Sequence, residues 1–387
     1  MKQFTNGLHA VVAGIRGALK CFVCGGFGAV PCFEAFGVRN VAFLMGGLLL
    51  LSSSSFASGA GFARNFGGQI RANVQILATA VDISGNEFIA GNFDSNAQAF
   101  GAVTLSKLGN QDAFVAKLDA SGTVLWAKNF GGSGATASGQ GLAADSSGNV
   151  YLGGFFQNAD LTTPSLTKIG TIDAFAIKLD TTGTITWAKN FGGNGATASG
   201  QGLAADSSGN VYLGGYFQNG NLTTPALARI GNGDAFAIKL DATGTTSWAK
   251  NFGGSGAFAI GYGLAADSSG NVYLGGYFES ANLTSPSLTR IGHFDAFAIK
   301  LDATGTITWA KNFGGSGASA IGQGLAADSS GNVYLGGYFQ NANLTTPSLT
   351  MIGNVDAFAI KLDATGTTTW AKYFGGSSPL FSLHLII

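Results

Sequence analysis

The sequence predicts an all-β protein assembled from one repeated unit, and three observations support this prediction. All five tryptophans lie 61 residues apart, at Trp126, Trp187, Trp248, Trp309 and Trp370. The aspartate of a recurring Asp-Ala-Phe triplet keeps the same step, and a fixed period of this size indicates an array of one supersecondary unit. Short runs of alternating apolar and polar residues recur throughout the array, whereas the 3.6-residue periodicity of a helix does not.

Each period contains four segments with the pattern of a β-strand. Residues 295–301 (DAFAIKL) alternate in polarity, the turn 302–305 (DATG) follows, and 306–313 (TITWAKNF) is a β-branched and aromatic run. After a glycine-rich link, 324–328 (GLAAD) and 333–339 (VYLGGYF) flank a second tight turn, SSGN. The unit is therefore two antiparallel hairpins.

Four antiparallel strands repeated radially form one blade of a β-propeller. The GLAAD segment consists of small residues, which fit the crowded position near the axis, and the tryptophan segment fits the broad periphery. The predicted order from inside to outside is GLAAD, VYLGGYF, DAFAIKL, TITWAKNF. The glycine-rich link and the long loop before each DAF triplet then emerge on one face, which we call the long-loop face, and such loops commonly carry recognition.

The chain supplies five complete periods and parts of a sixth blade. Residues 62–68 (FARNFGG) stand where WAKNFGG is expected, and 377–387 reach the start of a further inner strand. We expect an open or truncated ring rather than a closed five-bladed ring, because an outermost strand at the N-terminus needs partners supplied later. Unpaired blade edges invite association, so self-association through these edges is also expected.

The first 57 residues are predicted to be a lead and secretory signal that is removed. Arg39 and Asn40 precede an apolar run at 41–51, and serines and the small-residue site 55–57 follow it. The run has 11 residues, too few to span a bilayer comfortably, so no stable membrane span is expected after cleavage; a retained anchor is the alternative. Residues 58–376 form the predicted repeat domain and 377–387 a tail.

Charge and cysteine content limit the function classes. The chain has 20 basic and 20 acidic residues, and charged residues are only 10% of the total, so nothing indicates nucleic-acid binding. All three cysteines, Cys21, Cys24 and Cys32, lie in the lead. The mature chain would therefore have neither a disulfide framework nor a cysteine zinc site.

The recurring DAF, GTxxW, FGG and DSSGNVY elements, with a proline-containing loop such as NLTTPSLT, resemble the SBBP family of bacterial β-propeller repeats over about residues 62–376. The resemblance implies an exported protein, either secreted, periplasmic or on the bacterial cell surface, with propeller modules and usually no assigned reaction. It transfers no catalytic residue. One difference is that the family name refers to seven blades, whereas five complete ones are present here.

No catalytic residue, cofactor or metal site is predicted. The stretch LDATGTITW is similar to a motif of quinone-dependent dehydrogenase propellers, but those enzymes need singular acidic, metal-binding residues, and the periods here are nearly identical. The tryptophans are therefore expected to pack between blades. No period carries a histidine at a repeated position, so a Ser-His-Asp arrangement is not expected.

A few positions on the long-loop face are candidates for binding. One residue just before each inner strand should lie near the axis, either as part of a binding rosette or as a polar plug; these residues are Gln140, Gln201, Tyr262 and Gln323. Two further candidates, Glu279 and His293, break the repeat with an acid and a histidine. Two functions stay open. The chain is either a non-enzymatic interaction module that binds glycan, matrix or protein through this face, or a propeller enzyme with a site between blades.

Overall fold

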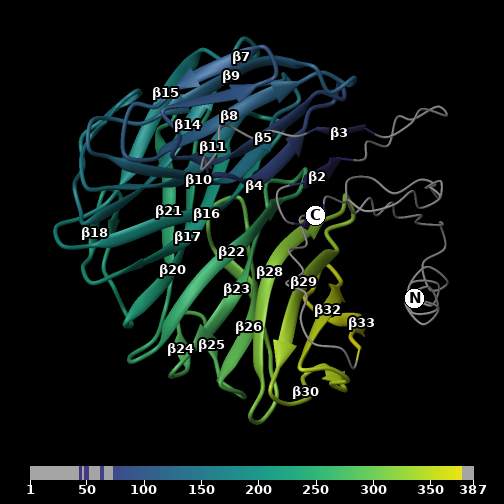
Figure 1. Ribbon diagram of the computed structural model, residues 1–387. Helices are drawn as coiled ribbons and strands as arrows, with labels where there is room; N and C mark the ends of the chain where they lie inside the picture. Colours follow the sequence, from purple (N-terminus) through teal and green to yellow (C-terminus); the bar gives the residue numbers. More distant parts are fainter. Residues whose placement is uncertain (1–42, 46–47, 52–61, 65–72, 377–387) are drawn as a thin grey trace.

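The computed structural model describes residues 43–45, 48–51, 62–64 and 73–376, and every regular element in these ranges is a β-strand. None of these residues belongs to a helix of the length and apolarity that a membrane span requires. Figure 1 shows the strands fanned out as successive blades along the chain. The predicted fold class, an all-β array of four-stranded antiparallel propeller blades, is confirmed.

The five complete blades, numbered along the chain, have the predicted strand order from inside to outside. The inner strands are β4 (Val74–Val81), β10 (Thr136–Ala144), β16 (Thr197–Ala205), β22 (Phe258–Ala266) and β28 (Ser319–Ala327). The second strands are β5 (Glu87–Phe93), β11 (Val150–Gln157), β17 (Val211–Gln218), β23 (Val272–Glu279) and β29 (Val333–Gln340). The third strands are β8 (Asp112–Leu118), β14 (Ile172–Leu179), β20 (Gly233–Leu240), β26 (Phe294–Leu301) and β32 (Val355–Leu362). The outer strands are β9 (Val124–Phe130), β15 (Ile185–Phe191), β21 (Thr246–Phe252), β27 (Ile307–Phe313) and β33 (Thr368–Phe374).

Small side chains on the inner strands follow from how closely the blades approach there. A Cβ on Gly202 would lie 2.4 Å from the carbonyl oxygen of Tyr262 on the next inner strand. Space is also limited within blade 3, where a Cβ on Gly215 of the second strand would lie 2.0 Å from the carbonyl oxygen of Ser199 on the paired inner strand. Only glycine avoids such contacts, which explains why the Gly-Leu-Ala-Ala segment lies innermost.

Each long loop contains a short hairpin, and in blades 2 to 5 this hairpin is hydrogen-bonded to the preceding blade. The hairpins are β6 (Ala97–Phe100) with β7 (Val103–Ser106), β12 (Leu161–Thr162) with β13 (Ser165–Leu166), β18 (Leu222–Thr223) with β19 (Ala226–Leu227), β24 (Leu283–Thr284) with β25 (Ser287–Leu288), and β30 (Leu344–Thr345) with β31 (Ser348–Leu349). In blade 3, the Thr223 amide donates to the carbonyl of Gly192 in blade 2 at 2.9 Å, and the Gly192 amide donates to Thr224 at 3.2 Å. Blades 2, 4 and 5 repeat this link. The long-loop face is therefore held by backbone hydrogen bonds.

A separate small sheet precedes blade 1. It comprises β1 (Phe43–Met45), β2 (Leu48–Leu51) and β3 (Phe62–Arg64), with Leu49 opposite Arg64. The segment predicted to be a lone outermost strand therefore has a partner, and that detail of the prediction was wrong. Its partner β2 comes from the apolar run 41–51 and not from a repeat. The predicted cleavage site at 55–57 and the tail at 377–387 lie outside the described residues.

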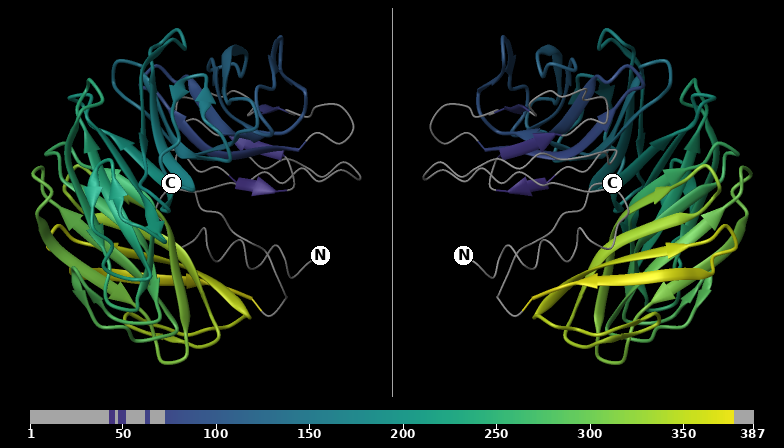
Figure 2. Two further views of the ribbon diagram at one scale, coloured as in Figure 1. Left: turned by 90° about the vertical axis from the view of Figure 1, so that its left-hand side faces the viewer. Right: turned by 90° about the vertical axis from the view of Figure 1, so that its right-hand side faces the viewer.

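The five blades form an arc. Each inner strand contacts the inner strand of the next blade, from β4 through β10, β16 and β22 to β28. Single parallel bridges also join the third strand of one blade to the inner strand of the next, as between Gly233 and Phe258. Among the described residues, no contact of comparable extent joins blade 5 to blade 1. Figure 2 shows these two blades apart at the ends of the arc.

The apolar cores lie between blades rather than within them. In the core between blades 4 and 5, Tyr273, Ala296, Ala298 and Phe313 of blade 4 meet Val333, Leu335, Phe339, Phe358 and Ile360 of blade 5. We call the side of a blade that faces the next blade its trailing face, and the opposite side its leading face. Because each core is shared, a blade depends on its neighbour for stability.

Blade 1 carries one buried carboxylate that breaks the repeat. Glu87 occupies the position of Val150 and Val211 in later blades. Its side chain is only 3% exposed, and its Oε2 atom has no hydrogen-bond partner among the residues that the structure describes. Burial raises the pKa of Glu87 from 4.5 to about 7. An uncompensated buried carboxylate favours its protonated form, so this group binds a proton more tightly in the folded chain than in the unfolded one.

We therefore expect the stability of the protein to fall between pH 4.5 and about 7 because of Glu87. The folded-state pKa lies above the unfolded value, so the contribution of this group is fully present below pH 4.5 and is lost as the pH rises through about 7. Glu87→Val, which restores the residue of later blades, should raise the free energy of unfolding at pH 8 by about 1–3 kcal/mol. Urea unfolding of both chains at pH 4 and pH 8 measures this, and parallel pH dependences would contradict it.

Candidate ligand-binding site

Four of the candidate residues occupy one equivalent position on successive inner strands. Gln140, Gln201, Tyr262 and Gln323 each lie at the β-bulge of their strand, where one extra residue interrupts the register between two glycines. All four side chains are half-buried. Gln140 and Gln201 donate from Nε2 to the Oγ of the serine two residues earlier, both at 2.8 Å. In blades 2 and 3, this position is thus occupied by an amide bonded to its own strand.

Blade 4 differs, because aromatic side chains gather at the long-loop end of its strands. The ring of Tyr262 stacks on Tyr277, with centroids 6.0 Å apart and an interplanar angle of 28°. Tyr277 also lies 5.4 Å from Phe294, and Phe258 lies 6.2 Å from Tyr216 of blade 3. These five half-buried residues are referred to below as the blade-4 aromatic cluster.

Glu279 lies within this cluster. It is the last residue of β23, directly opposite Phe258 on one side and Phe294 on the other. Glu279 is thus the cross-strand neighbour of both phenylalanines, although the ring of Phe258 packs on Tyr216 of blade 3. Among the described residues, none forms a hydrogen bond or ion pair with this half-buried carboxylate. The structure thus brings Glu279 and Tyr262 into one cluster, while His293 lies exposed in the loop before β26.

The tyrosines of the site keep their protons at neutral pH. Burial raises the pKa of Tyr277 far above its ordinary value, and the neighbouring Tyr262 and the carboxylate of Glu279 raise it further. Burial also raises the pKa of Tyr262, with smaller effects from Tyr216 and Tyr338. Among the described residues, none forms a hydrogen bond with the side-chain hydroxyl of Tyr216, Tyr262, Tyr277 or the nearby Tyr338. The site therefore combines aromatic faces, hydroxyl donors and one carboxylate acceptor, and no other described residue uses these polar groups.

Comparison with known proteins decides the family. The sequence model of the SBBP family, described as "Beta-propeller repeat", matches residues 125–154, 186–221, 248–277 and 308–344. The chain is an SBBP-type β-propeller repeat protein. Each match covers the outer strand of one blade and the first two strands of the next, so the family's sequence unit is shifted by three strands from the structural blade.

Relatives of this SBBP repeat protein are distant. The uncharacterized WD repeat-containing protein L264 of Acanthamoeba polyphaga mimivirus is 22% identical over 379 aligned residues, covering 76% of this chain and 27% of that protein. Among solved structures, a Synechocystis apocarotenoid oxygenase mutant is 12% identical with a TM-score of 0.44, covering 89% of this chain and 71% of that chain. Kuenenia stuttgartiensis hydrazine synthase is 9% identical with a TM-score of 0.39, covering 74% and 62%. None of these similarities bears on the function of this chain.

The tryptophans of the SBBP repeats lie between blades. Trp248 donates from Nε1 to the carbonyl of Ala303 in the next blade at 3.1 Å. Its ring covers Gly305, where a Cβ would lie 2.8 Å from the indole and where the φ of +80° also favours glycine. Trp126, Trp187 and Trp309 make the equivalent bond. The described residues contain no cluster of three or more histidine, cysteine or acidic side chains able to hold a metal ion.

Sequence reasoning missed Phe258, Tyr277 and Phe294. Phe258 stands where blades 2, 3 and 5 have threonine or serine, and Phe294 stands where the other blades have glutamine, isoleucine, glycine or valine. Comparing the copies position by position for aromatic residues, rather than only for acids and histidines, would have found both. Both residues also fill space at blade junctions, since Phe258 covers Gly233 and Phe294 lies opposite Ser319. Each of these two junctions thus pairs one large residue with one small residue.

Proposed function

We propose that this SBBP repeat protein is a non-enzymatic interaction module that binds a carbohydrate at the long-loop end of blade 4. The observation that supports this most is the blade-4 aromatic cluster around Glu279. Sugar rings present C–H faces that pack on aromatic rings, and their hydroxyls need donors and acceptors of fixed position. The tyrosine hydroxyls and the carboxylate supply these groups.

The rest of the repeat suits such a role because it is a preformed scaffold. The cluster lies on paired strands, and the neighbouring hairpins are bonded to adjacent blades, so little ordering is needed when a ligand binds. The export inferred from the N-terminal segment would place the site among extracellular glycans. The alternative of an enzyme with a site between blades has no specific observation in its favour among the described residues.

The test is a glycan array probed with the purified chain, followed by calorimetry with the best ligand. Tyr262→Gln and Glu279→Gln introduce the residues that other blades already carry at these positions, so the fold should tolerate them. Each should weaken binding by about tenfold or more, the effect of removing a central contact of an interface.

Gln140→Ala, at the position of Tyr262 but on blade 2, is the matched control and should leave the affinity unchanged. Thermal unfolding of all variants separates loss of the site from loss of the fold. The proposal fails if the array shows no ligand, or if a ligand binds both blade-4 variants as tightly as the original chain.

A further inference from the structure

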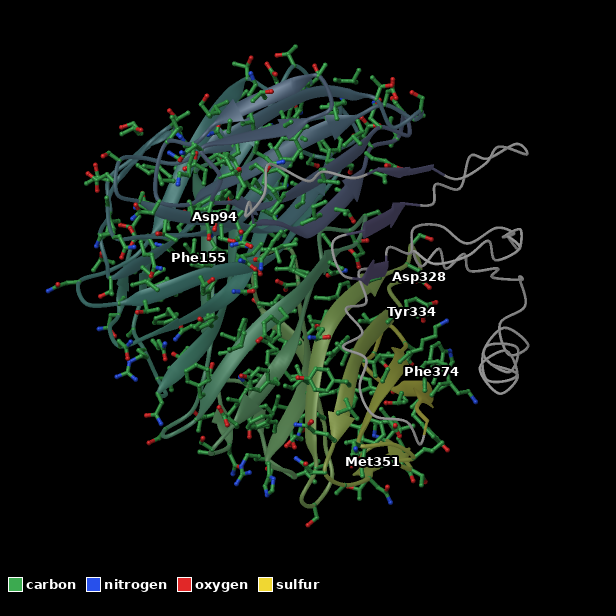
Figure 3. All side chains as sticks on the ribbon, in the orientation of Figure 1. Asp94, Phe155, Asp328, Tyr334, Met351 and Phe374 are labelled. Carbon is green, nitrogen blue, oxygen red and sulfur yellow. The ribbon has the colours of Figure 1, made fainter. Side chains whose placement is uncertain are left out.

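Each blade places an aromatic ring, a carboxylate and a lysine together at the end of the sheet opposite the long-loop face. In blade 4, the Nζ of Lys300 lies 5.2 Å from the ring centroid of Tyr273, and the hydroxyl of Tyr273 donates to Asp267 at 2.9 Å. Figure 3 shows Asp328 and Tyr334, the carboxylate and the ring of the same arrangement in blade 5, next to each other. The first three blades repeat it. A cation over an aromatic ring is attracted to its π-electrons, so the ring stabilises the lysine.

At the long-loop end of blade 4, the same strand provides rings and a carboxylate without a cation. Alternation along β23 places Tyr277 and Glu279 on the trailing face, together with Tyr273. Phe294 is directly opposite Glu279 on the paired strand, and its ring centroid lies 5.4 Å from that of Tyr277. The stacked ring of Tyr262 lies 6.0 Å from Tyr277. Among the described residues, no lysine, arginine or histidine forms an ion pair with Glu279.

The basic residues of the loop before β26 do not fill this role. Arg290 donates from Nη1 to the backbone carbonyls of Gly292 and His293, the latter at 3.4 Å, so its guanidinium is held against its own loop. His293 is exposed. A half-buried carboxylate without a counter-charge is solvated less well than in water, and a ligand that supplies a positive charge offsets that cost. A positively charged ligand group would therefore complement this cluster.

We propose that the saccharide bound at the blade-4 aromatic cluster carries an ammonium group, which binds over the rings beside Glu279. The choice of an amino sugar with a free amine rests on the proposed carbohydrate function and narrows its ligand. Blades 2, 3 and 5 have glutamine at the position of Glu279, so blade 4 differs from them in combining aromatic rings with a carboxylate. Those glutamines offer matched positions for control variants.

Calorimetry of the full chain with three tetrasaccharides of the same linkage provides the test. Their sugars are glucose, N-acetylglucosamine and glucosamine, so the rings differ in carrying a hydroxyl, an acetamido or an ammonium group. At mildly acidic pH, where the glucosamine amines are protonated, the glucosamine tetrasaccharide should bind about tenfold more tightly than either neutral one, as expected for a cation that contacts aromatic rings and a carboxylate. Added salt should weaken only the binding of the charged tetrasaccharide.

Two variants separate the charge from the fold. Glu279→Gln keeps an oxygen acceptor but removes the charge, so it should abolish the preference for glucosamine. Gln157→Glu, made in the Glu279→Gln chain, introduces a carboxylate at the matched position of blade 2, where Gln140 and Ile172 stand in place of Tyr262 and Phe294. This second variant should not restore the preference. Thermal unfolding checks that both chains are folded.

A glucosamine tetrasaccharide that binds no more tightly than the neutral ones, or a preference that survives in Glu279→Gln, would overturn the ammonium site. Binding of the neutral tetrasaccharides would then still support the carbohydrate function. Choline and its uncharged analogue, in which carbon replaces nitrogen, address the opposite case. A preference for choline that Glu279→Gln abolishes, with no saccharide bound, would confirm the ammonium site and contradict the carbohydrate function. Absence of both kinds of binding would overturn both.

Discussion

Trp248→Ala should lower the free energy of unfolding by about 3 kcal/mol, the lower end of the range for truncating a large aromatic core residue because Trp248 is half-buried, whereas Trp370→Ala should cost less than half of that. The two tryptophans differ in whether a following blade contacts the indole ring. The ring of Trp248 covers Gly305 of the next blade, lies 6.1 Å from Tyr212 and donates to Ala303. Among the described residues, the one aromatic neighbour of Trp370 is Tyr334 of its own blade, with the ring centroids 6.3 Å apart.

Urea unfolding followed by far-ultraviolet circular dichroism measures both variants without relying on the fluorescence that the substitutions remove. Because repeat arrays can unfold in more than one step, the comparison should use the transition that involves the substituted blade. Trp187→Ala, in another interior blade, is the matched control and should resemble Trp248→Ala. Equal losses for Trp248→Ala and Trp370→Ala would contradict a blade 5 that lacks a neighbour.

Asp234→Ala should lower the free energy of unfolding by about 3–5 kcal/mol, because it leaves buried donors without an acceptor. The carboxylate of Asp234 is fully buried and accepts hydrogen bonds from the Gly231 amide at 2.8 Å and from Asn251 Nδ2 at 2.7 Å. The Ile230 amide donates to it as well, at 2.7 Å. This aspartate of the DAF triplet therefore fixes the end of the long loop to the third strand.

A double-mutant cycle with Asn251→Ala measures how much of this cost belongs to one pair, and a coupling of about 1 kcal/mol or more is expected for residues in one network. Asp241→Ala is the control in the same blade, since Asp241 caps a turn whose hydrogen bonds are exposed and water can replace them. A loss for Asp234→Ala no larger than that for Asp241→Ala would show that the buried network does not stabilise the loop.

The sequence alone determined the architecture of the blades, because local constraints repeat at a fixed period. Turn glycines with positive φ, such as Gly148 and Gly183, mark the two tight turns, and alternation between them marks the strands. The size of the side chains ordered the strands correctly from inside to outside. The close approach of Gly202 to Tyr262 of the next blade is the physical basis of that order.

Only the tertiary structure decided which side chains meet at the candidate site. Phe258, Glu279 and Phe294 belong to three different strands, and the register of two antiparallel pairings places them side by side. Tyr262, at the bulge of the same inner strand as Phe258, adds a fourth member, and it stacks on Tyr277 of the second strand. Register depends on hydrogen bonds between segments distant in sequence, so a repeat pattern identifies the strands while the contacts across them follow only from the folded chain.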